Sequence, residues 1–271
     1  MSLEFHQVDA FTDQPFRGNP AAVYRLDSWP ADDLLQRIAT EHNYRKPPSW
    51  CVRARPGDPL VHPAREVPLC GHATLAAAHV LFERCGEAGD RLEFISQSGV
   101  LRVFRETEGL LALDFPALVP RSWGDPELER ALRVSPVDAL AADKLLVLLE
   151  SEQAVRECKP DLTAIARLPW QGVIVTARGQ DVDFVSRFFA PAVGVDEDPV
   201  TGSAHCSLIP YWSRRLAKRM LTAQQLSARG VSSGVGSTGT RVSIAGRAVT
   251  VFRASCCCEP AASDAWRIQG G

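Results

Sequence analysis

The 271-residue chain has no long hydrophobic run, no strong excess of charge and few aromatic residues. No apolar segment approaches the roughly 20 residues that a transmembrane helix needs, so we expect no membrane partner. Lys and Arg number 30 against 32 Asp and Glu, and the cations are scattered, so we expect no nucleic-acid partner. Phosphate-loop and dinucleotide-binding fingerprints are missing as well, which argues against a nucleotide cofactor.

A secretion signal is also missing, because the start MSLEFHQVDAF lacks a charged segment followed by a long apolar one. A cytoplasmic protein is therefore expected. Five of the eight cysteines are dispersed, and the other three are consecutive at 256–258. Adjacent cysteines make a poor tetrahedral ligand set and no histidine pair lies near them, so we expect no metal site.

What is present is a mixture of strand and helix patterns. Alternating apolar residues predict strands over 3–11, 101–117, 171–177 and 183–191, the second of them a hairpin that turns at Glu108-Gly109. Two other segments, CGHATLAAAHVLFERCG (70–86) and TGSAHCSLIPYWSRRLAKR (201–219), begin at a Gly-containing turn and continue as helices that are apolar nearly all round for three turns. A helix that is apolar on every face has to be buried. A further helix is expected over 31–42.

The two buried helices form a repeat. Gly71-His72-Ala73-Thr74 aligns with Gly202-Ser203-Ala204-His205, 131 residues later, which predicts an α+β chain of two similar halves. Two helix N-termini that face each other at the junction would suit a carboxylate, since their N–H groups and helix dipoles both favour an anion. Two buried helices without a ligand remain the alternative at this point.

Three sequence blocks carry a family likeness. DAFTDQPFRGNPAAV (9–23), EVPLCGHATLAAAHVLF (66–82) and FFAPAVGVDEDPVTGSAH (188–205) resemble the PhzF (phenazine biosynthesis-like) family, in its order and spacing. The resemblance implies a diaminopimelate-epimerase-like fold, in which two pseudo-symmetric halves each wrap a barrel-like sheet around a central helix. We expect the halves at 1–117 and 118–258, with the active site in the cleft between them and a homodimer as the assembly.

The resemblance also implies an activity. Family members of known chemistry move a proton between carbons of a small cyclic carboxylic acid without a cofactor, and a single carboxylate can serve as base and then as acid. The matching positions here are His72 and Asp198 as catalytic residues, and Asn19, Gly71, Gly202 and Ser203 as substrate-binding residues. Related racemases carry a cysteine in each half. Here Thr201 faces Cys70, which argues against a two-cysteine mechanism.

One block departs from the family. After Asn43 the family reads Leu-Ser-Glu-Thr-Ala-Phe, with the Glu as its general base, whereas this chain reads YRKPPSW and places Lys46 at the Glu position. Residues 43–52 can be encoded AAC-TAT-CGG-AAA-CCG-CCT-TCC-TGG-TGC-GTG. Read two bases later, the same bases give Leu-Ser-Glu-Thr-Ala-Phe-Leu-Val. The loss of one base would therefore convert the family block into the present one.

Three further segments give the same result. In another reading frame, the bases of residues 59–62 can encode Arg-Trp-Phe, and those of 230–240 (GVSSGVGSTGT) can encode a strand and turn. The bases of 253–259 can encode Gly-Glu-Leu-Leu-Leu followed by a stop codon. We interpret these segments as frame-shifted relative to the ancestral gene, which makes 259–271 an out-of-frame tail. If the shifts are sequencing errors, the protein carries the family's Glu at the position of Lys46 and is an isomerase or epimerase. If they are real, it is an anion-binding homologue without turnover or a non-functional product.

Other readings of single residues are less favoured. Lys46 would need burial to act as a base, and its neighbours are polar or proline. His79 lies on the apolar helix and is expected in the core, whereas His205 is equally compatible with the site and with packing. Ser203 lacks the second glycine of a nucleophile elbow, which argues against a serine hydrolase.

Overall fold

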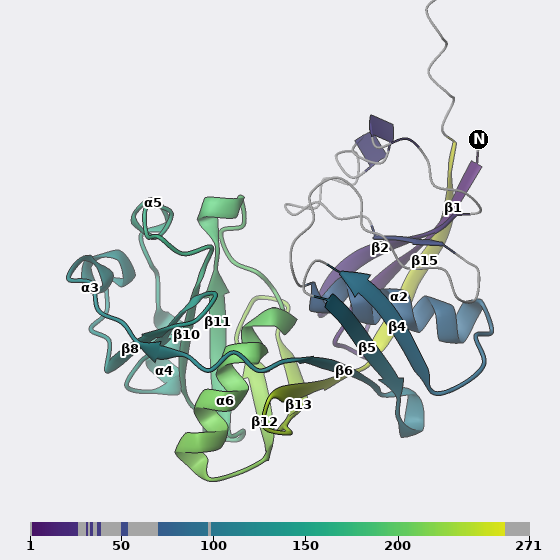
Figure 1. The fold of residues 1–271 in the computed structure, drawn as a ribbon. Coiled ribbons are helices and arrows are strands. Elements are labelled where there is room, and N and C mark those ends of the chain that lie inside the picture. The colour runs from purple at the N-terminus through teal and green to yellow at the C-terminus, as the bar shows by residue number, and fades with distance from the viewer. Residues whose placement is uncertain are drawn as a thin grey trace, which may run out of the picture.

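The computed structural model describes residues 2–26, 31, 33–34, 37–38, 50–53, 70–96 and 99–257, and these residues form an α+β structure (Figure 1). In this part of the chain no helix has the length and apolar character needed to cross a membrane. Lys46 and the tail 259–271 lie outside the described residues. Most of the expected helix 31–42 and most of 44–62 lie outside them too.

The first sheet has four strands in the order β15-β1-β2-β3. Strand β1 pairs antiparallel with β2 and β15, and β2 pairs parallel with β3. The strand predicted over 3–11 is thus confirmed as β1. The last strand, β15, joins the first strands of the chain, although its residues fall in the range expected for the second half; the boundary at 117 stays a prediction. The bounds are β1 Ser2–Ala10, β2 Asn19–Leu26, β3 Trp50–Arg53 and β15 Ala248–Cys257.

Helix α2 (Gly71–Arg84) lies between the first sheet and strands β4 (Arg91–Ser96) and β5 (Gly99–Arg105) in Figure 1. We call the first sheet, α2, β4 and β5 the first group of elements, and α2 is its central helix. Its burial was predicted and is confirmed, because 11 of its 14 residues are buried. Four alanines lie on different faces of the helix. Their small side chains let strands approach the helix backbone from several sides.

The second sheet has eleven strands in the order β4-β5-β6-β14-β13-β12-β11-β10-β9-β8-β7. It passes from one group of elements to the other through the antiparallel pair β6–β14. The predicted hairpin is confirmed, since β5 and β6 are joined by a turn where Glu108 and Gly109 have φ of 58° and 73°. The remaining bounds are β6 Leu111–Pro116, β7 Arg121–Ser122, β8 Asp138–Ala141, β9 Leu145–Leu148, β10 Val173–Arg178, β11 Phe184–Phe189, β12 Met220–Gln225, β13 Val231–Ser237 and β14 Arg241–Gly246.

Helix α6 (His205–Leu216) is the counterpart of α2 in the second group and follows the 3-10 turn η3 (Gly202–Ala204). Its first five residues and Trp212 are buried, but Arg214 and Arg215 are exposed. These buried residues agree with the burial predicted for three turns, and the cations of the last turn, which lies beyond those turns, face water. Three short helices cover the far side of the second sheet: α3 Glu127–Leu132, α4 Glu152–Glu157 and α5 Leu162–Ile165.

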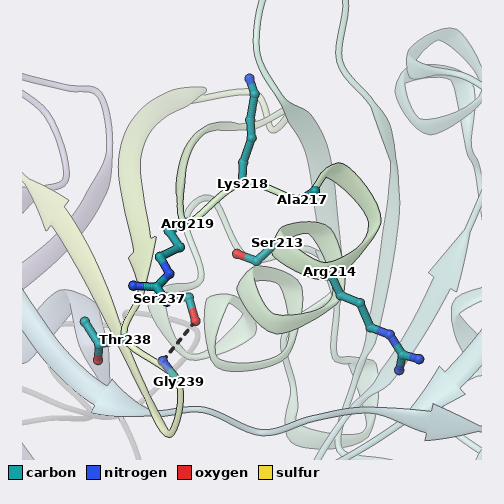
Figure 2. Close-up of a pocket in the computed structure, with 8 residues that line it drawn as sticks. All are labelled: Ser213, Arg214, Ala217, Lys218, Arg219, Ser237, Thr238 and Gly239. Atoms are coloured by element: carbon teal, nitrogen blue, oxygen red, sulfur yellow. Dashed lines mark hydrogen bonds between the residues drawn. The ribbon is translucent and has the colours of Figure 1, made fainter.

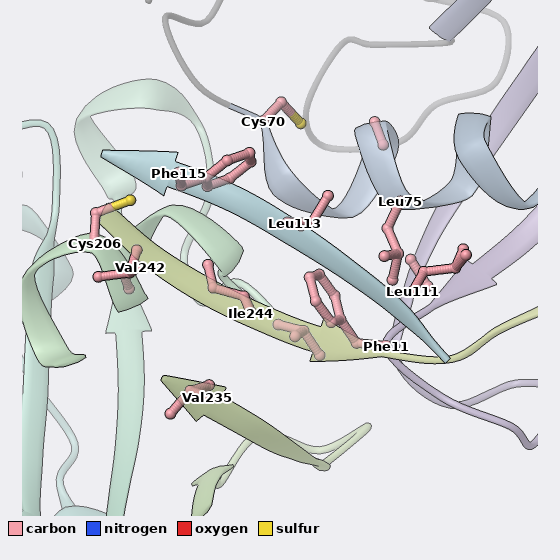
Figure 3. Packing of buried hydrophobic residues seen from close by; sticks show 14 of the residues in the cluster. Phe11, Cys70, Leu75, Leu111, Leu113, Phe115, Cys206, Val235, Val242 and Ile244 are labelled. Atoms are coloured by element: carbon pink, nitrogen blue, oxygen red, sulfur yellow. The ribbon is translucent and has the colours of Figure 1, made fainter. Parts of the chain in front are cut away.

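One hydrophobic core runs through both groups. Leu75 of α2, Leu113 and Phe115 of β6, and Leu208 and Trp212 of α6 belong to the same buried cluster. Figure 3 shows the start of α2 lying over β6 and β14, with Phe11 beneath them. Because the core is continuous at this point, the two helix starts are held relative to each other by packing on a shared sheet.

Three segments interpreted as frame-shifted contribute strands to the structure, the first of them β3, which pairs with β2. Residues 231–237 form β13, which pairs with β12 and β14 despite two glycines and three serines. Residues 254–257 end β15 opposite Ser2–Phe5, and Cys256 packs beside an apolar cluster. A sheet is joined by backbone hydrogen bonds, which any sequence without proline can make, so poor side chains do not prevent these pairings.

Candidate active site

The starts of the two repeated helices meet at a pair of glycines. A Cβ added to Gly71 would lie 3.1 Å from the Cα of Gly202, and one added to Gly202 would lie 3.1 Å from the Cα of Gly71. The space is closed on other sides by Phe115 beside Gly71 and by Phe11 beside Gly202. The predicted meeting of the helix N-termini is therefore confirmed, and glycine is needed at both positions for the backbones to approach this closely.

The polar groups at this junction are backbone N–H groups. Neither Cys70 nor Thr201, the residues that precede the two helix starts, caps its helix with a side-chain hydrogen bond. The first N–H groups of a helix have no carbonyl one turn earlier to bind, and the helix dipole places partial positive charge beside them. Two such ends side by side form a surface suited to a carboxylate or another small anion.

Asp198 lies beside the second helix start and is 3% exposed. Its Oδ1 accepts a hydrogen bond from Asn19 Nδ2 at 3.0 Å, and its Oδ2 accepts one from Thr201 Oγ1 at 2.6 Å. Asn19 Nδ2 also donates to the carbonyl of Val200 at 2.6 Å. The structure thus brings Asn19, from the first group, and Asp198 together across 179 positions of sequence, and it fixes the plane of the carboxylate between them.

His72 lies in the first turn of α2 and is 8% exposed. Its Nδ1 is 3.6 Å from the sulfur of Cys70. Ser203 is half-buried in the turn η3, next to the buried Gly202. All the predicted site residues are therefore at or beside one of the two helix starts, while the catalytic and binding roles assigned to them stay predictions.

His205 and Cys206 follow directly and are packed in the core. Nδ1 of His205 donates to the carbonyl of Thr201 at 3.1 Å, and burial lowers the pKa of this imidazole to about 4, so His205 is neutral at pH 7. Burial also raises the pKa of the Cys206 thiol to about 12. Of the two readings of His205, the structure supports packing, and Cys206 is an inert thiol rather than a nucleophile.

Two contributors were not identified from the sequence. Gln225, the last residue of β12, contacts Asp198 and Thr201 and is 3% exposed. The sequence marks Gln225 only weakly. It occupies the next inward position of β12 after Leu221 and Ala223, and it is polar where they are apolar. A polar residue at an inward strand position is the feature that could have marked it.

The second is Arg229, which joins the two groups. Its guanidinium donates to Asp9 Oδ1 at 3.0 Å and to the carbonyls of Gly18 and Arg17 at 2.8 and 2.9 Å. Asp9 Oδ2 accepts from the backbone N–H of Phe16 at 2.6 Å. Burial raises the pKa of Asp9, against the opposing effects of this N–H and of Arg229. This clamp holds the turn that leads into Asn19.

A pocket of about 590 Å³ lies at the opposite end of α6 (Figure 2). Its cations are Arg214, Lys218 and Arg219, and Figure 2 shows the first two extending away from Ser213. Lys218 Nζ already pairs with Asp183 Oδ1 at 2.7 Å. Cations at a helix C-terminus offset the negative end of the dipole, which itself repels an anion. The helix starts are therefore the better place for a carboxylate.

Candidate metal ligands do not gather in the described part of the chain: no group of three or more His, Cys, Asp or Glu side chains is placed to hold an ion there. Of the cysteine run at 256–258, Cys256 packs against apolar residues.

The chain is similar to known proteins over most of its length. The model of the phenazine biosynthesis-like protein family, PhzC-PhzF, matches residues 8–254. An uncharacterized isomerase of Pseudomonas aeruginosa is 64% identical over 260 residues, which cover 93% of this chain and 97% of the relative.

Solved structures show the same fold. A PhzF-family phenazine biosynthesis protein from Enterococcus faecalis superposes with a TM-score of 0.89 at 40% identity, covering 95% of this chain and 100% of that one. A probable proline racemase from Agrobacterium radiobacter, at 12% identity and a TM-score of 0.62, covers 96% and 94% and shares the fold alone. The predicted diaminopimelate-epimerase-like fold is thus confirmed, and the chain belongs to the phenazine biosynthesis-like (PhzF) family.

Proposed function

We propose that the protein is a cofactor-independent isomerase or epimerase that moves a proton on a small carboxylic acid. The observation that carries this proposal is the contact of two helix starts at Gly71 and Gly202, beside the buried carboxylate of Asp198. Relatives that bear the name isomerase support the reaction class at the level of the family. A homodimer in the cytoplasm is the corresponding proposal for its assembly and location.

The substrate carboxylate would bind at the helix starts. Backbone N–H groups of Gly71, Gly202 and Ser203 would donate to its oxygens, together with the Ser203 hydroxyl, and the two dipoles would stabilise its charge. Asn19 would border the same place, since its amide nitrogen reaches Asp198. No side chain at either glycine could be tolerated without separating the helix starts.

The chemistry would be a shift of one proton. A base removes a proton from one carbon, the electron pair of that C–H bond moves into the neighbouring unsaturated system, and a proton is added at another carbon. The reaction is balanced without an oxidant or a reductant. His72 and Asp198 would assist at the reacting carbons, and the principal base of the family is the Glu whose place Lys46 occupies here.

A hydrogen-exchange experiment tests this function. The protein is incubated in D₂O with a panel of unsaturated cyclic carboxylic acids, and loss of carbon-bound ¹H is followed by NMR. We expect exchange in a variant in which residues 44–51 read Leu-Ser-Glu-Thr-Ala-Phe-Leu-Val, and a loss of at least about a hundredfold when Asp198→Asn is added. Absence of exchange from every acid in this variant would refute the isomerase proposal.

A second function is favoured by Lys46. Without the family's Glu, the chain as written would keep its anion-binding helix starts but would not turn a ligand over. Calorimetry with benzoate, an unreactive cyclic carboxylate, separates the two cases. If the chain with Lys46 and the variant bind benzoate with equal affinity, and only the variant catalyses exchange, the chain with Lys46 is a binding homologue.

We also propose that segments within 44–62, 230–240 and 253–271 are frame-shifted. The observation behind the idea is that each of these segments, read in another frame, can give a family-like segment. Sequencing of the gene over codons 40–65 and over its last sixty bases is the direct test. A confirmed Lys46 codon in the same frame would establish the altered block as real.

A further inference from the structure

Gln225 is a buried amide at the end of a strand that otherwise supplies apolar groups to the core. It is 3% exposed, and its neighbours along the inward side of β12 are Leu221 and Ala223. Burial of an amide is costly unless its donors and acceptor are all used. The contacts of Gln225 therefore indicate what its amide group is there to hold.

All the contacts of this amide go to the loop that carries Asp198. Its Oε1 accepts from the backbone N–H of Thr201 at 2.8 Å. Its Nε2 donates to the backbone carbonyl of Asp198 at 2.6 Å and to Thr201 Oγ1 at 3.3 Å. A backbone N–H can only donate and a carbonyl can only accept, so the orientation of the amide is determined by its partners.

This orientation sets the direction of the next hydrogen bond. Because Thr201 Oγ1 accepts from Gln225, its own hydrogen is available for Asp198 Oδ2, which lies 2.6 Å away. Asn19 donates to Oδ1 from the other side. Both oxygens of Asp198 thus accept a hydrogen bond, and the two bonds together fix the plane of the carboxyl group.

We infer that Gln225 is a positioning residue of the active site, which acts through Thr201 to hold the carboxyl group of Asp198 in one plane. The inference rests on the proposed isomerase function. It assigns Gln225 to the orientation of this carboxyl group and not to contact with the substrate.

A double-mutant cycle tests this assignment. Gln225→Met removes the amide and keeps the length of the side chain, and Thr201→Val removes the hydroxyl and keeps its shape. The matched control is Gln224→Met, on the same strand and only half-buried. All variants are made in the chain whose residues 44–51 restore the family block. Exchange in D₂O, benzoate affinity and the ¹³C resonance of the Asp198 carboxyl are measured at pH 7.

We expect Gln225→Met and Thr201→Val each to slow exchange by at least about tenfold, while benzoate affinity changes by less than about twofold. The double variant should be no slower than the slower single variant, because the two residues act in series. The Asp198 resonance should shift in both single variants and not in Gln224→Met. Additive losses, or an unchanged Asp198 resonance in folded Gln225→Met, would overturn the inference.

Failure of the isomerase proposal gives a different result. If the parent variant exchanges no acid, the proposed function fails, yet the Asp198 resonance still decides the role of Gln225. If Gln225→Met does not fold, Gln225→Glu replaces it, since a carboxylate keeps the acceptor for Thr201 N–H but cannot donate to Thr201 Oγ1. The same shift of the Asp198 resonance is then expected, and its absence would refute the assignment.

Discussion

The two helix starts share an extended residue before the glycine, but they differ in their side chains and in their first turn, which is α-helical after Cys70 and 3-10 after Thr201. Thr74 Oγ1 donates to the carbonyl of Cys70 at 2.7 Å, and His205 Nδ1 donates to the carbonyl of Thr201 at 3.1 Å, so residues 131 positions apart make the same bond to the residue four earlier. At the preceding position, however, Cys70 contacts His72, whereas Thr201 belongs to the network of Asp198 and Gln225. The repeat keeps the position of this hydrogen bond, and the polar chemistry beside it is different in each half.

The largest effect expected from this difference is a sensitivity of the second half to acid. In the unfolded chain His205 takes up a proton below about pH 6.5, but in the folded chain only below about 4. The unfolded state therefore binds more protons in this window, and the free energy of unfolding should fall by about 3 kcal/mol as the pH drops through it. Urea unfolding between pH 7 and pH 4 measures this slope.

His205→Thr gives the second helix the residue of the first and serves as the control. We expect this variant to lose stability at pH 7, because it leaves space in the core, but to lose less additional stability between pH 6.5 and 4. An identical pH slope in the variant and the parent would show that other groups cause the acid sensitivity.

Substitution of the paired glycines tests whether the helix starts must touch. Gly71→Ala and Gly202→Ala should each destabilise the fold by about 1–3 kcal/mol, because each added Cβ lies 3.1 Å from the opposing Cα. Gly124→Ala is the control, since no atom lies within 4 Å of its Cβ. If all three variants had the same unfolding midpoint, the close contact would be disproved.

Two arginines allow a comparison between buried and accessible carboxylates. Arg229 pairs with Asp9, which is 3% exposed, whereas Arg241 pairs with Asp114, which is 25% exposed. Arg229→Met leaves a buried carboxylate without its cation and should cost about 1–3 kcal/mol, while Arg241→Met should cost at most about 1 kcal/mol.

The pH dependence of the Arg229→Met variant sharpens this comparison. Burial already raises the pKa of Asp9, and loss of Arg229 should raise it further. When folding raises the pKa of a carboxyl group, the free energy of unfolding decreases as the pH rises from the unfolded-state pKa through the folded-state pKa. The cost of Arg229→Met should therefore be larger at pH 8 than at pH 5, and the opposite trend would exclude Asp9 as the cause.

The smallest effect is expected in β13, which is poor in side chains beside its neighbours β12 and β14. Gly234→Thr should stabilise the protein by about 0.5–1 kcal/mol, because threonine favours a strand and the position is open. Gly236→Thr should gain less, since its Cβ would lie 2.8 Å from Met220 Sδ. Thermal unfolding of both variants measures the difference, and no gain at Gly234 would argue that the strand is already optimal.

Prediction from the sequence succeeded where a pattern extends over many residues. The burial of α2 follows from its continuous apolar surface, and the contact of the helix starts follows from the repeat of Gly71 at Gly202. Prediction failed where one residue decides. Gln225 is a single polar side chain whose partners come from a loop 24 positions away, and the clamp of Asp9 by Arg229 spans 220 positions.

The limits of the sequence pattern have physical causes as well. The last turn of α6 lies beyond the three apolar turns of the pattern, and its Arg214 and Arg215 face water. Residues 230–240 have no hydrophobic pattern, yet β13 forms between two strands that supply its hydrogen-bonding partners. Tertiary pairing of this kind overrides local preference, and a single sequence does not display it.

The pairing of β1 with β15 has a consequence for folding during synthesis on the ribosome. Strand β1 is made first, and its neighbour in the sheet is the last described segment to leave the ribosome. At about 5–20 residues per second, the first strand waits on the order of ten to fifty seconds for that partner. During synthesis one side of β1 has no strand beside it, a state in which chaperones and neighbouring nascent chains compete for the same edge.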